Sequence, residues 1–390
     1  MKIIVILRIL CNLFRSTEIF FLKQFHAFAF DGTAGRTVGH LTWLSNNDSQ
    51  VIAYCHPTRR LSRLVAGYVI CCFTLVFLPD DTFADEPLPE SLQVKVEETQ
   101  LAKRFAVRES VESPFEYSLS AGYRTDNLSW SIADGGVNIA SEVSWKKTAI
   151  TILRAAGRLN LGSDWLVRGN YTTGAVKSGN NQDSDYAGSD RTQEYSRSNS
   201  STGGSVEDVS IGLGRKFGLF DLGSGMAMYI VPLAGLSIHQ QNLKMYDGQQ
   251  TIPYNGAIPG LDNSYDTKWK SSWLGMDALL GLGENFLLNS TVEYHWADYS
   301  ADANWNLRGD LSHPVSFNHV ANGYGMLVSV GASYRFNRNF LLNATLERQK
   351  WDTYTGYDQT NFSNGTTSYY TLNPVSWDAT SFLLGAVYQF

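Results

Sequence analysis

The end of the chain alternates between two kinds of residue. Counting back from the last position, every second residue of 382–390 is apolar or aromatic, and the residues between them are smaller and more mixed. A period of two is the signature of a β-strand whose two faces meet different surroundings. The apolar set is Phe390, Tyr388, Ala386, Leu384 and Phe382.

The same alternation recurs upstream and predicts about ten strands. In residues 286–297, for example, Phe286, Leu288 and Val292 occupy even positions, whereas Glu293 and His295 share the other face. We expect that second face to carry a polar network. The expected strands cover about residues 115–125, 139–161, 165–175, 206–219, 226–244, 268–282, 286–297, 321–336, 340–351 and 377–390. Long polar segments join some of these strands at 176–204, 247–266, 298–318 and 352–376, and short turns join the others.

Short turns that alternate with long polar loops are typical of one class of fold. In transmembrane barrels the turns lie on the periplasmic side, the long loops are extracellular, and apolar outward residues alternate with polar inward ones. A closed sheet can cross lipid because all of its backbone groups are paired. The sequence therefore predicts an all-β fold, a transmembrane antiparallel up-and-down β-barrel of about ten strands in the bacterial outer membrane. A soluble β-sandwich is the alternative, and the loop asymmetry disfavours it.

The first part of the chain differs from the rest. Arg59, Arg60 and Arg63 precede an apolar run at 64–78, and Ala84 precedes a polar stretch. This order is that of a signal peptide, and the run is shorter than the roughly 20 residues that span a bilayer. We interpret residues 1–58 as a mis-assigned extension, 59–84 as the signal peptide, 85–114 as a periplasmic N-terminal segment and 115–390 as the barrel.

Composition excludes several classes of function. The formal net charge is −6, which argues against nucleic acid as a partner. Cysteine is absent after Cys72, and the histidines that follow show no paired metal-ligand spacing. We therefore expect no metal and no cofactor.

Several motifs in the predicted barrel resemble one known family, the omptins, which are outer-membrane proteases of Gram-negative bacteria. The similarity covers about residues 115–390, and the terminal Phe390 resembles the residue that the barrel assembly machinery reads in outer-membrane barrels. The motifs are Tyr171-Thr172-Thr173, Gly179-Asn180 and Asp183-Ser184-Asp185-Tyr186, supported by Gly135-Gly136, Val143 to Lys146, Leu233-Ala234-Gly235 and Phe286 to Tyr294.

The resemblance implies a site at the barrel mouth. In omptins an Asp pair faces an Asp–His pair, and a water held between them attacks the peptide, which requires an imidazole as general base. Asp183 and Asp185 match the first pair. Read without gaps, the second pair falls on Asn304 and Asn306, which cannot accept a proton, so we expect proteolysis to be lost.

Two further acidic residues match the positions that bind basic side chains in this family, namely Asp126 and Asp302. The first hypothesis is therefore a non-catalytic omptin-like barrel whose acidic extracellular groove binds a cationic peptide or surface. An active omptin-type endopeptidase and a narrow porin-like channel are the alternatives. Porin-like proteins of the Protochlamydia type are also divergent barrels, although no specific motif points to them.

Asp183 and Asp185 also have a simpler interpretation as solvated loop residues, because Asp, Ser, Asn and Gly are common in loops. Three strands precede 183–185 and seven precede 302–306, so all of these residues should lie at the same extracellular end. The expected surroundings are outer-membrane lipid and lipopolysaccharide.

Overall fold

The computed structural model describes residues 113–390, apart from 163, 224–225 and 283–284. The expected extension at 1–58, the signal peptide at 59–84 and most of the segment at 85–114 lie outside the described residues. Among the described residues, no helix is long and apolar enough to cross a membrane.

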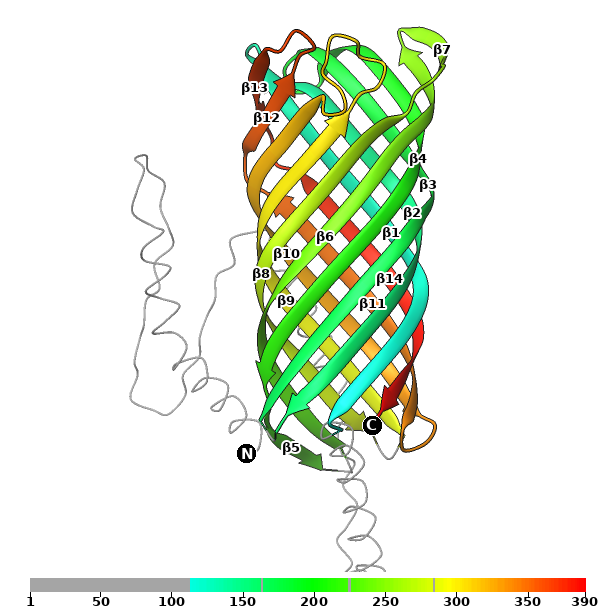
Figure 1. The fold of residues 1–390 in the computed structure, drawn as a ribbon, viewed down its shortest axis with the longest axis vertical. Coiled ribbons are helices and arrows are strands. Elements are labelled where there is room, and N and C mark those ends of the chain that lie inside the picture. Colours follow the sequence, from blue (N-terminus) through cyan, green and yellow to red (C-terminus); the bar gives the residue numbers. More distant parts are fainter. Residues whose placement is uncertain (1–112, 163, 224–225, 283–284) are drawn as a thin grey trace, which may run out of the picture. The chain divides into compact units, whose positions relative to one another are not determined.

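The described residues form fourteen strands in one antiparallel sheet. Ten of these strands close a barrel, in which β14 pairs with both β11 and β1 (Figure 1). This confirms the predicted closed barrel. The strands are β1 (Phe115–Asp134), β2 (Val137–Leu161), β3 (Trp165–Gly188), β4 (Thr192–Arg215), β5 (Phe217–Gly223), β6 (Met226–Ile252), β7 (Tyr254–Ile258), β8 (Asn263–Leu282), β9 (Phe286–Asn304), β10 (Phe317–Arg335), β11 (Phe340–Thr353), β12 (Gly356–Asn361), β13 (Thr367–Leu372) and β14 (Ser376–Gln389).

Four short strands are additional to the ten that close the barrel. Strands β5 and β7 pair with β6, whereas β12 and β13 form a hairpin between β10 and β1. The hairpin stands above the shorter β11 and β14 and continues the wall there (Figure 1). Because the long connections of outer-membrane barrels are extracellular, we call the end that carries β7, β12 and β13 the extracellular end.

The long polar segments expected as loops are largely strands. Strand β3 runs on to Gly188 and β4 begins at Thr192, so most of 176–204 is a paired hairpin. The segments 247–266, 298–318 and 352–376 also contain strand residues. Their polar composition has a physical reason, because above the membrane the outer face of a strand meets water instead of lipid. The sequence prediction of these loop boundaries was therefore wrong.

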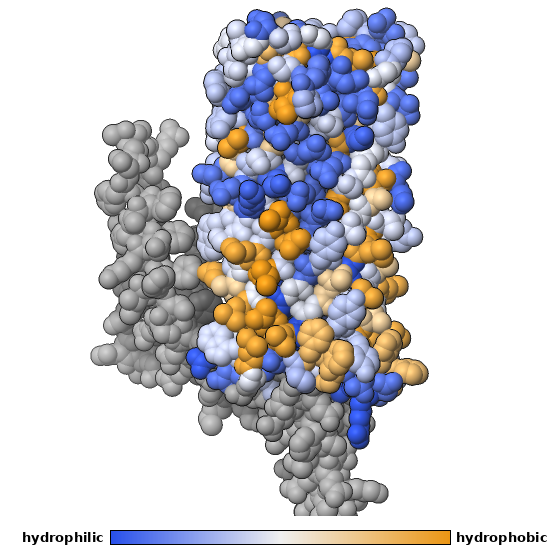
Figure 2. Space-filling model, viewed as in Figure 1, coloured by the Kyte–Doolittle hydropathy of each residue, from blue (hydrophilic) through white to orange (hydrophobic). Residues whose placement is uncertain are grey.

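On the face drawn in Figure 2, apolar residues are concentrated in the half of the barrel near the chain's C-terminus. Strands β3 and β4 have 24 residues each. A transmembrane strand needs only about 9–11 residues. More than half of each strand therefore extends beyond the membrane on the extracellular side.

The closing strand has the two faces that the alternation predicts. Phe382, Leu384 and Phe390 are 48%, 57% and 63% exposed on the outer face, whereas Leu383 and Val387 are buried inside. The apolar set thus belongs to the lipid-facing band, as expected for an outer-membrane barrel.

The extracellular half of the interior is filled by aromatic side chains, which we call the aromatic plug. The rings of Trp351 and Trp377 stack 5.5 Å apart at 19°, and those of Trp145 and Tyr265 stack 5.1 Å apart. Gly325 makes room for this packing, because a Cβ there would lie 2.4 Å from the Trp351 ring. The plug consists of Trp130, Trp145, Tyr265, Trp269, Tyr299, Trp305, Phe317, Trp351 and Trp377.

Candidate functional site

The barrel mouth contains the acidic pair that the motif predicts. Asp183 lies opposite the inward-facing Val143 in the β2–β3 pairing, and Asp185 follows two positions later on the same face of β3. The indole nitrogen of Trp305 donates to Asp183 Oδ2 over 3.4 Å. Arg308 also interacts electrostatically with both carboxylates. Both partners come from residues 305–316, the segment between β9 and β10, which we call the mouth segment.

The other predicted residues do not face this pair. From Glu293 to Ala303 the odd positions of β9 are buried, so Asp302 is exposed on the outer wall and Asn304 points away from the interior. Asn318 donates to Asp302 over 2.6 Å. Asp302 and Asn304 therefore do not face the acidic pair, although 183–185 and 302–306 do lie at the same end of the barrel.

Asn304 and Asn306 have structural partners of their own. The ring nitrogen Nδ1 of His313 lies 2.7 Å from Asn304 Oδ1. The Asn306 amide donates to the carbonyl of Gly260 over 2.7 Å and accepts from the backbone of Asp262 over 3.0 Å. Asn306 therefore ties the mouth segment to the turn that precedes β8.

Asp126 was expected just after the first strand, but it lies within β1. Its carboxylate accepts two bonds from Arg124, at 2.5 and 2.6 Å, and Arg124 also bonds Asp208 over 2.7 Å. Gln241 and Trp377 complete its shell at 3.0 and 3.1 Å. Asp126 is 3% exposed and bonds the plug residue Trp377, so it is enclosed in the interior and has no bond to Asp183.

Three buried histidines pair with carboxylates inside the barrel. His239 lies 3.0 Å from Asp208, and His319 lies 2.9 Å from Asp358. The third pair joins His295 and Glu293 over 3.0 Å, which agrees with the predicted polar network. The first two pairs were missed, because their members lie 31 and 39 positions apart on different strands and leave no local motif.

The His319 pair lies nearest to the mouth, but it is enclosed. Its Nε2 faces Asp358, and its Nδ1 lies 2.7 Å from the hydroxyl of Tyr265. The Trp130 ring packs edge-on against it with centroids 4.7 Å apart. Because both ring nitrogens are engaged and the side chain is 0% exposed, His319 has no position for an attacking water.

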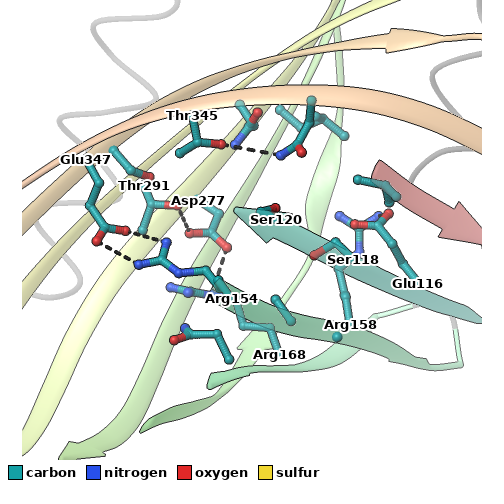
Figure 3. Close-up of a pocket in the computed structure, with 18 of the residues that line it drawn as sticks. Glu116, Ser118, Ser120, Arg154, Arg158, Arg168, Asp277, Thr291, Thr345 and Glu347 are labelled. Carbon is teal, nitrogen blue, oxygen red and sulfur yellow. Dashed lines mark hydrogen bonds and ion pairs between the residues drawn. The ribbon is translucent and has the colours of Figure 1, made fainter. Parts of the chain in front are cut away.

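The periplasmic half of the interior contains a polar cavity of about 290 Å³ (Figure 3). Three arginines project from its walls, and each meets a carboxylate. Gln349 and His239 are among its upper lining residues, and none of the plug residues lines it. The pairs are Arg154–Glu347 at 2.8 Å, Arg168–Asp277 at 3.0 Å and Arg158–Glu116 at 2.7 Å.

The sequence comparison decides the family. A sequence model of the Protochlamydia outer membrane protein family matches residues 118–390, which is most of the barrel. The chain belongs to this family. The protein is thus an outer-membrane β-barrel protein. No curated protein matches the sequence.

The chain is similar to solved structures of outer-membrane barrels, and one of these has a TM-score above 0.5. The outer membrane protease OmpT from Escherichia coli has a TM-score of 0.59 and 15% identity, over 71% of this chain and 96% of that chain. The translocator domain of the autotransporter NalP from Neisseria meningitidis has a TM-score of 0.33 and 11% identity, over 77% and 98%. OprG from Pseudomonas aeruginosa has a TM-score of 0.28 and 12% identity, over 71% and 97%. The omptin resemblance is confirmed at the level of the fold.

The mouth should respond to pH through Asp183. Burial, followed by the charge of Asp185, raises the pKa of Asp183 to about 7. At pH values between the ordinary pKa of an aspartate and about 7, Asp183 is protonated in the folded mouth but ionised when the mouth opens. The folded mouth is therefore most stable at low pH, and its stability falls as the pH rises to about 7. We expect faster amide exchange in the mouth segment at pH 8 than at pH 5, after correction for intrinsic rates.

The Asp183→Asn variant should exchange slowly at both pH values, because the amide cannot ionise. Asp190→Asn, at an exposed position of the β3–β4 turn, is the matched control and should behave like the unaltered protein. An unchanged pH response in Asp183→Asn would assign the effect to another group.

Proposed function

We propose that this protein is a sealed, non-catalytic surface barrel whose extracellular end binds a ligand. The observation that carries the proposal is the aromatic plug, which occupies the interior between the mouth and the polar cavity. A barrel of ten strands is narrow, nearer the side-chain-filled small barrels than the wide porins. The long walls beyond the membrane then serve to present the extracellular end.

The surroundings of the acidic pair support the absence of proteolysis. An omptin-type attack needs a base across the mouth, and Asp183 and Asp185 meet Trp305 and Arg308 there. General-base assistance is worth about 10²–10⁴-fold in rate, so its loss leaves little turnover. A cationic ligand of the acidic groove, as proposed from the sequence, would have to displace Arg308.

Two measurements on the purified protein test the proposal. Reconstituted with lipopolysaccharide, it should not cleave a fluorogenic peptide that contains Arg-Arg or Arg-Lys. In a planar bilayer it should show no steady open-channel current. Cleavage that disappears in Asp185→Ala would establish an active protease, and a steady current would establish an open pore.

One observation favours a narrow channel as the second candidate. The polar cavity reaches the periplasmic rim at Glu116 and Gln389, and its charged walls could form one half of a pore. Such a channel would require the plug to move. The same bilayer recording separates the two functions, because only a channel gives discrete openings.

A further inference from the structure

A chain of polar side chains crosses the interior between the aromatic plug and the polar cavity. His239 lines the cavity, and its ring lies 4.7 Å from the ring of Trp351 in the plug. Its Nδ1 lies 3.0 Å from Asp208 Oδ1, and its Nε2 lies 3.0 Å from Ser237 Oγ. Ser237 Oγ then lies 2.7 Å from Ser271 Oγ, which is directly opposite in the β6–β8 pairing.

The second half of the chain mirrors the first. Ser271 Oγ lies 2.9 Å from His295 Nδ1, and His295 Nε2 lies 3.0 Å from Glu293 Oε2. Ser237 Oγ is also 3.4 Å from His295 Nδ1, but that nitrogen is already engaged by the shorter contact. The result is five links at hydrogen-bond distance, which we call the histidine chain. Its members are Asp208, His239, Ser237, Ser271, His295 and Glu293.

The five links need five hydrogens, and the neutral side chains supply only four. An ionised carboxylate has no hydrogen to donate, whereas a serine hydroxyl and a neutral imidazole have one each. With both histidines neutral, each directs its hydrogen to its carboxylate, and each serine directs its own to a histidine. No hydrogen then remains between the two serine oxygens, although they lie only 2.7 Å apart. One additional proton completes all of the links.

Another buried histidine, His319, needs no additional proton. Its links to Asp358 and Tyr265, and the link from Tyr265 to Tyr299, span 2.9, 2.7 and 2.6 Å. One neutral imidazole and two phenol hydroxyls supply the three hydrogens that these links require. This network is therefore complete when its histidine is neutral, unlike the histidine chain.

Both ends of the histidine chain are held as ionised carboxylates. Arg124 donates to Asp208 through Oδ2 over 2.7 Å, and Arg168 donates to Glu293 through Oε1 over 2.5 Å. Each arginine thus uses the oxygen that the histidine does not, and its permanent charge favours the ionised form of its partner. The additional proton therefore belongs to an imidazole.

The charges around His239 leave one negative charge to balance. Asp126 and Asp208 share a single cation, Arg124, and they are 3% and 4% exposed. Burial keeps water from solvating this excess charge, so a second cation beside Asp208 is strongly favoured.

The charges at the Glu293 end are better solvated. Glu293 and Asp277 share Arg168, but Asp277 lines the polar cavity and 27% of its side chain is exposed. The remaining ion pair nearby, Arg154 with Glu347, is neutral as a whole. The additional proton is therefore more favourable at the opposite end of the histidine chain.

A charged His239 also suits its contacts with the plug. Its ring lies 4.7 Å from Trp351 and 5.9 Å from Trp377, within the range at which a cation is attracted to an indole ring. We propose that His239 holds the additional proton at neutral pH and that its imidazolium fastens the floor of the aromatic plug. Both of its nitrogens then donate, both serine hydroxyls point toward His295, and His295 donates to Glu293. The proposal rests on the proposed function only in taking the plug as the seal.

Nitrogen NMR of the histidine rings tests the proposal. Full-length protein with ¹⁵N-labelled histidine is measured in detergent at pH 7.5, and the signals are assigned with His239→Gln and His295→Gln. We expect two protonated nitrogens on His239, one on His295 and one on His319. An unpaired histidine has a pKa of about 6.5 and is mostly neutral at this pH.

Ser237→Ala removes two of the five links, and the neutral side chains satisfy the three that remain. The second proton of His239 should then be lost at a pH about one unit lower, since one net hydrogen bond is worth about that much. Ser210→Ala is the matched control. Ser210 lies opposite Ser237 in the β4–β6 pairing and has no hydrogen-bond partner among the described residues, so the titration should be unchanged.

Exchange of the buried Trp351 indole hydrogen reports on the plug. It should accelerate at the pH where His239 loses its proton, after correction for the intrinsic rate. The inference is overturned if His239 has only one protonated nitrogen at pH 7.5, if His295 has two, if Ser210→Ala shifts the titration as far as Ser237→Ala, or if the Trp351 hydrogen does not respond. The bilayer and peptide assays report separately on whether the barrel is sealed and inactive.

Discussion

Replacing Arg124 with Met is expected to destabilise the barrel by at least about 3–5 kcal/mol, because removal of one partner leaves buried charge uncompensated. Arg124 is 2% exposed and bonds both Asp126 and Asp208. Methionine fills a similar volume without charge, so two carboxylates would remain in the interior without their cation. Urea unfolding in lipid vesicles, followed by tryptophan fluorescence, measures the change.

The matched control is Arg348→Met. Arg348 also meets a carboxylate, Asp378 at 3.0 Å, but its side chain is 53% exposed on the outer wall. An exposed pair is worth only about 0–1 kcal/mol, so this variant should unfold almost as the unaltered protein does. Adding Asp126→Asn and Asp208→Asn to Arg124→Met should recover part of the stability, since the amides carry no charge. Equal losses in both single variants would contradict the assignment.

Removing the stacked pair of the plug should open the barrel. The double variant Trp351→Ala and Trp377→Ala is expected to show discrete currents in a planar bilayer where the unaltered protein shows none. The two rings stack just above the level at which the polar cavity ends, and alanine leaves their volume empty. Each such truncation also costs about 3–5 kcal/mol, so the single variant Trp351→Ala is measured beside the double.

Trp296→Ala is the control for the plug variants. Trp296 is 47% exposed on the outer wall and takes no part in the filling of the interior. This variant should show no current in a planar bilayer. If the plug variants fold, as judged by gel mobility, and still pass no current, then the seal lies elsewhere in the interior.

Sequence alone predicted the part of the fold that touches lipid. In the lipid-facing band, apolar outward residues alternate with mixed inward ones. Phe382 and Leu384 are two of these outward residues and could be recognised from the sequence. Above the band both faces meet polar surroundings, and the strand from Gly179 to Asp185 consists of residue types that are common in loops. Only pairing with neighbouring strands shows that these residues are extended.

The candidate site was predicted in part. The motif placed Asp183 and Asp185 at the mouth, whereas Asn304, expected opposite them, points away from the interior. The alternation could have shown which residues face inward. Glu293 and His295 occupy inward positions, and counting on by twos along β9 reaches Ala303 and then Trp305. The pairing of Arg124 with Asp208 could not be inferred, since 84 positions separate them and no local pattern links β1 to β4.

The bond between Trp377 and Asp126 crosses the seam at which the first and last barrel strands meet. Trp377 belongs to β14 and is stacked in the plug, whereas Asp126 belongs to β1 and holds Arg124. Trp377 therefore links closure of the seam to completion of the plug. An assembly intermediate that lacks its last strand would lack both the bond to Asp126 and the Trp377 half of the stacked pair, and it would gain them together in the final step of biogenesis.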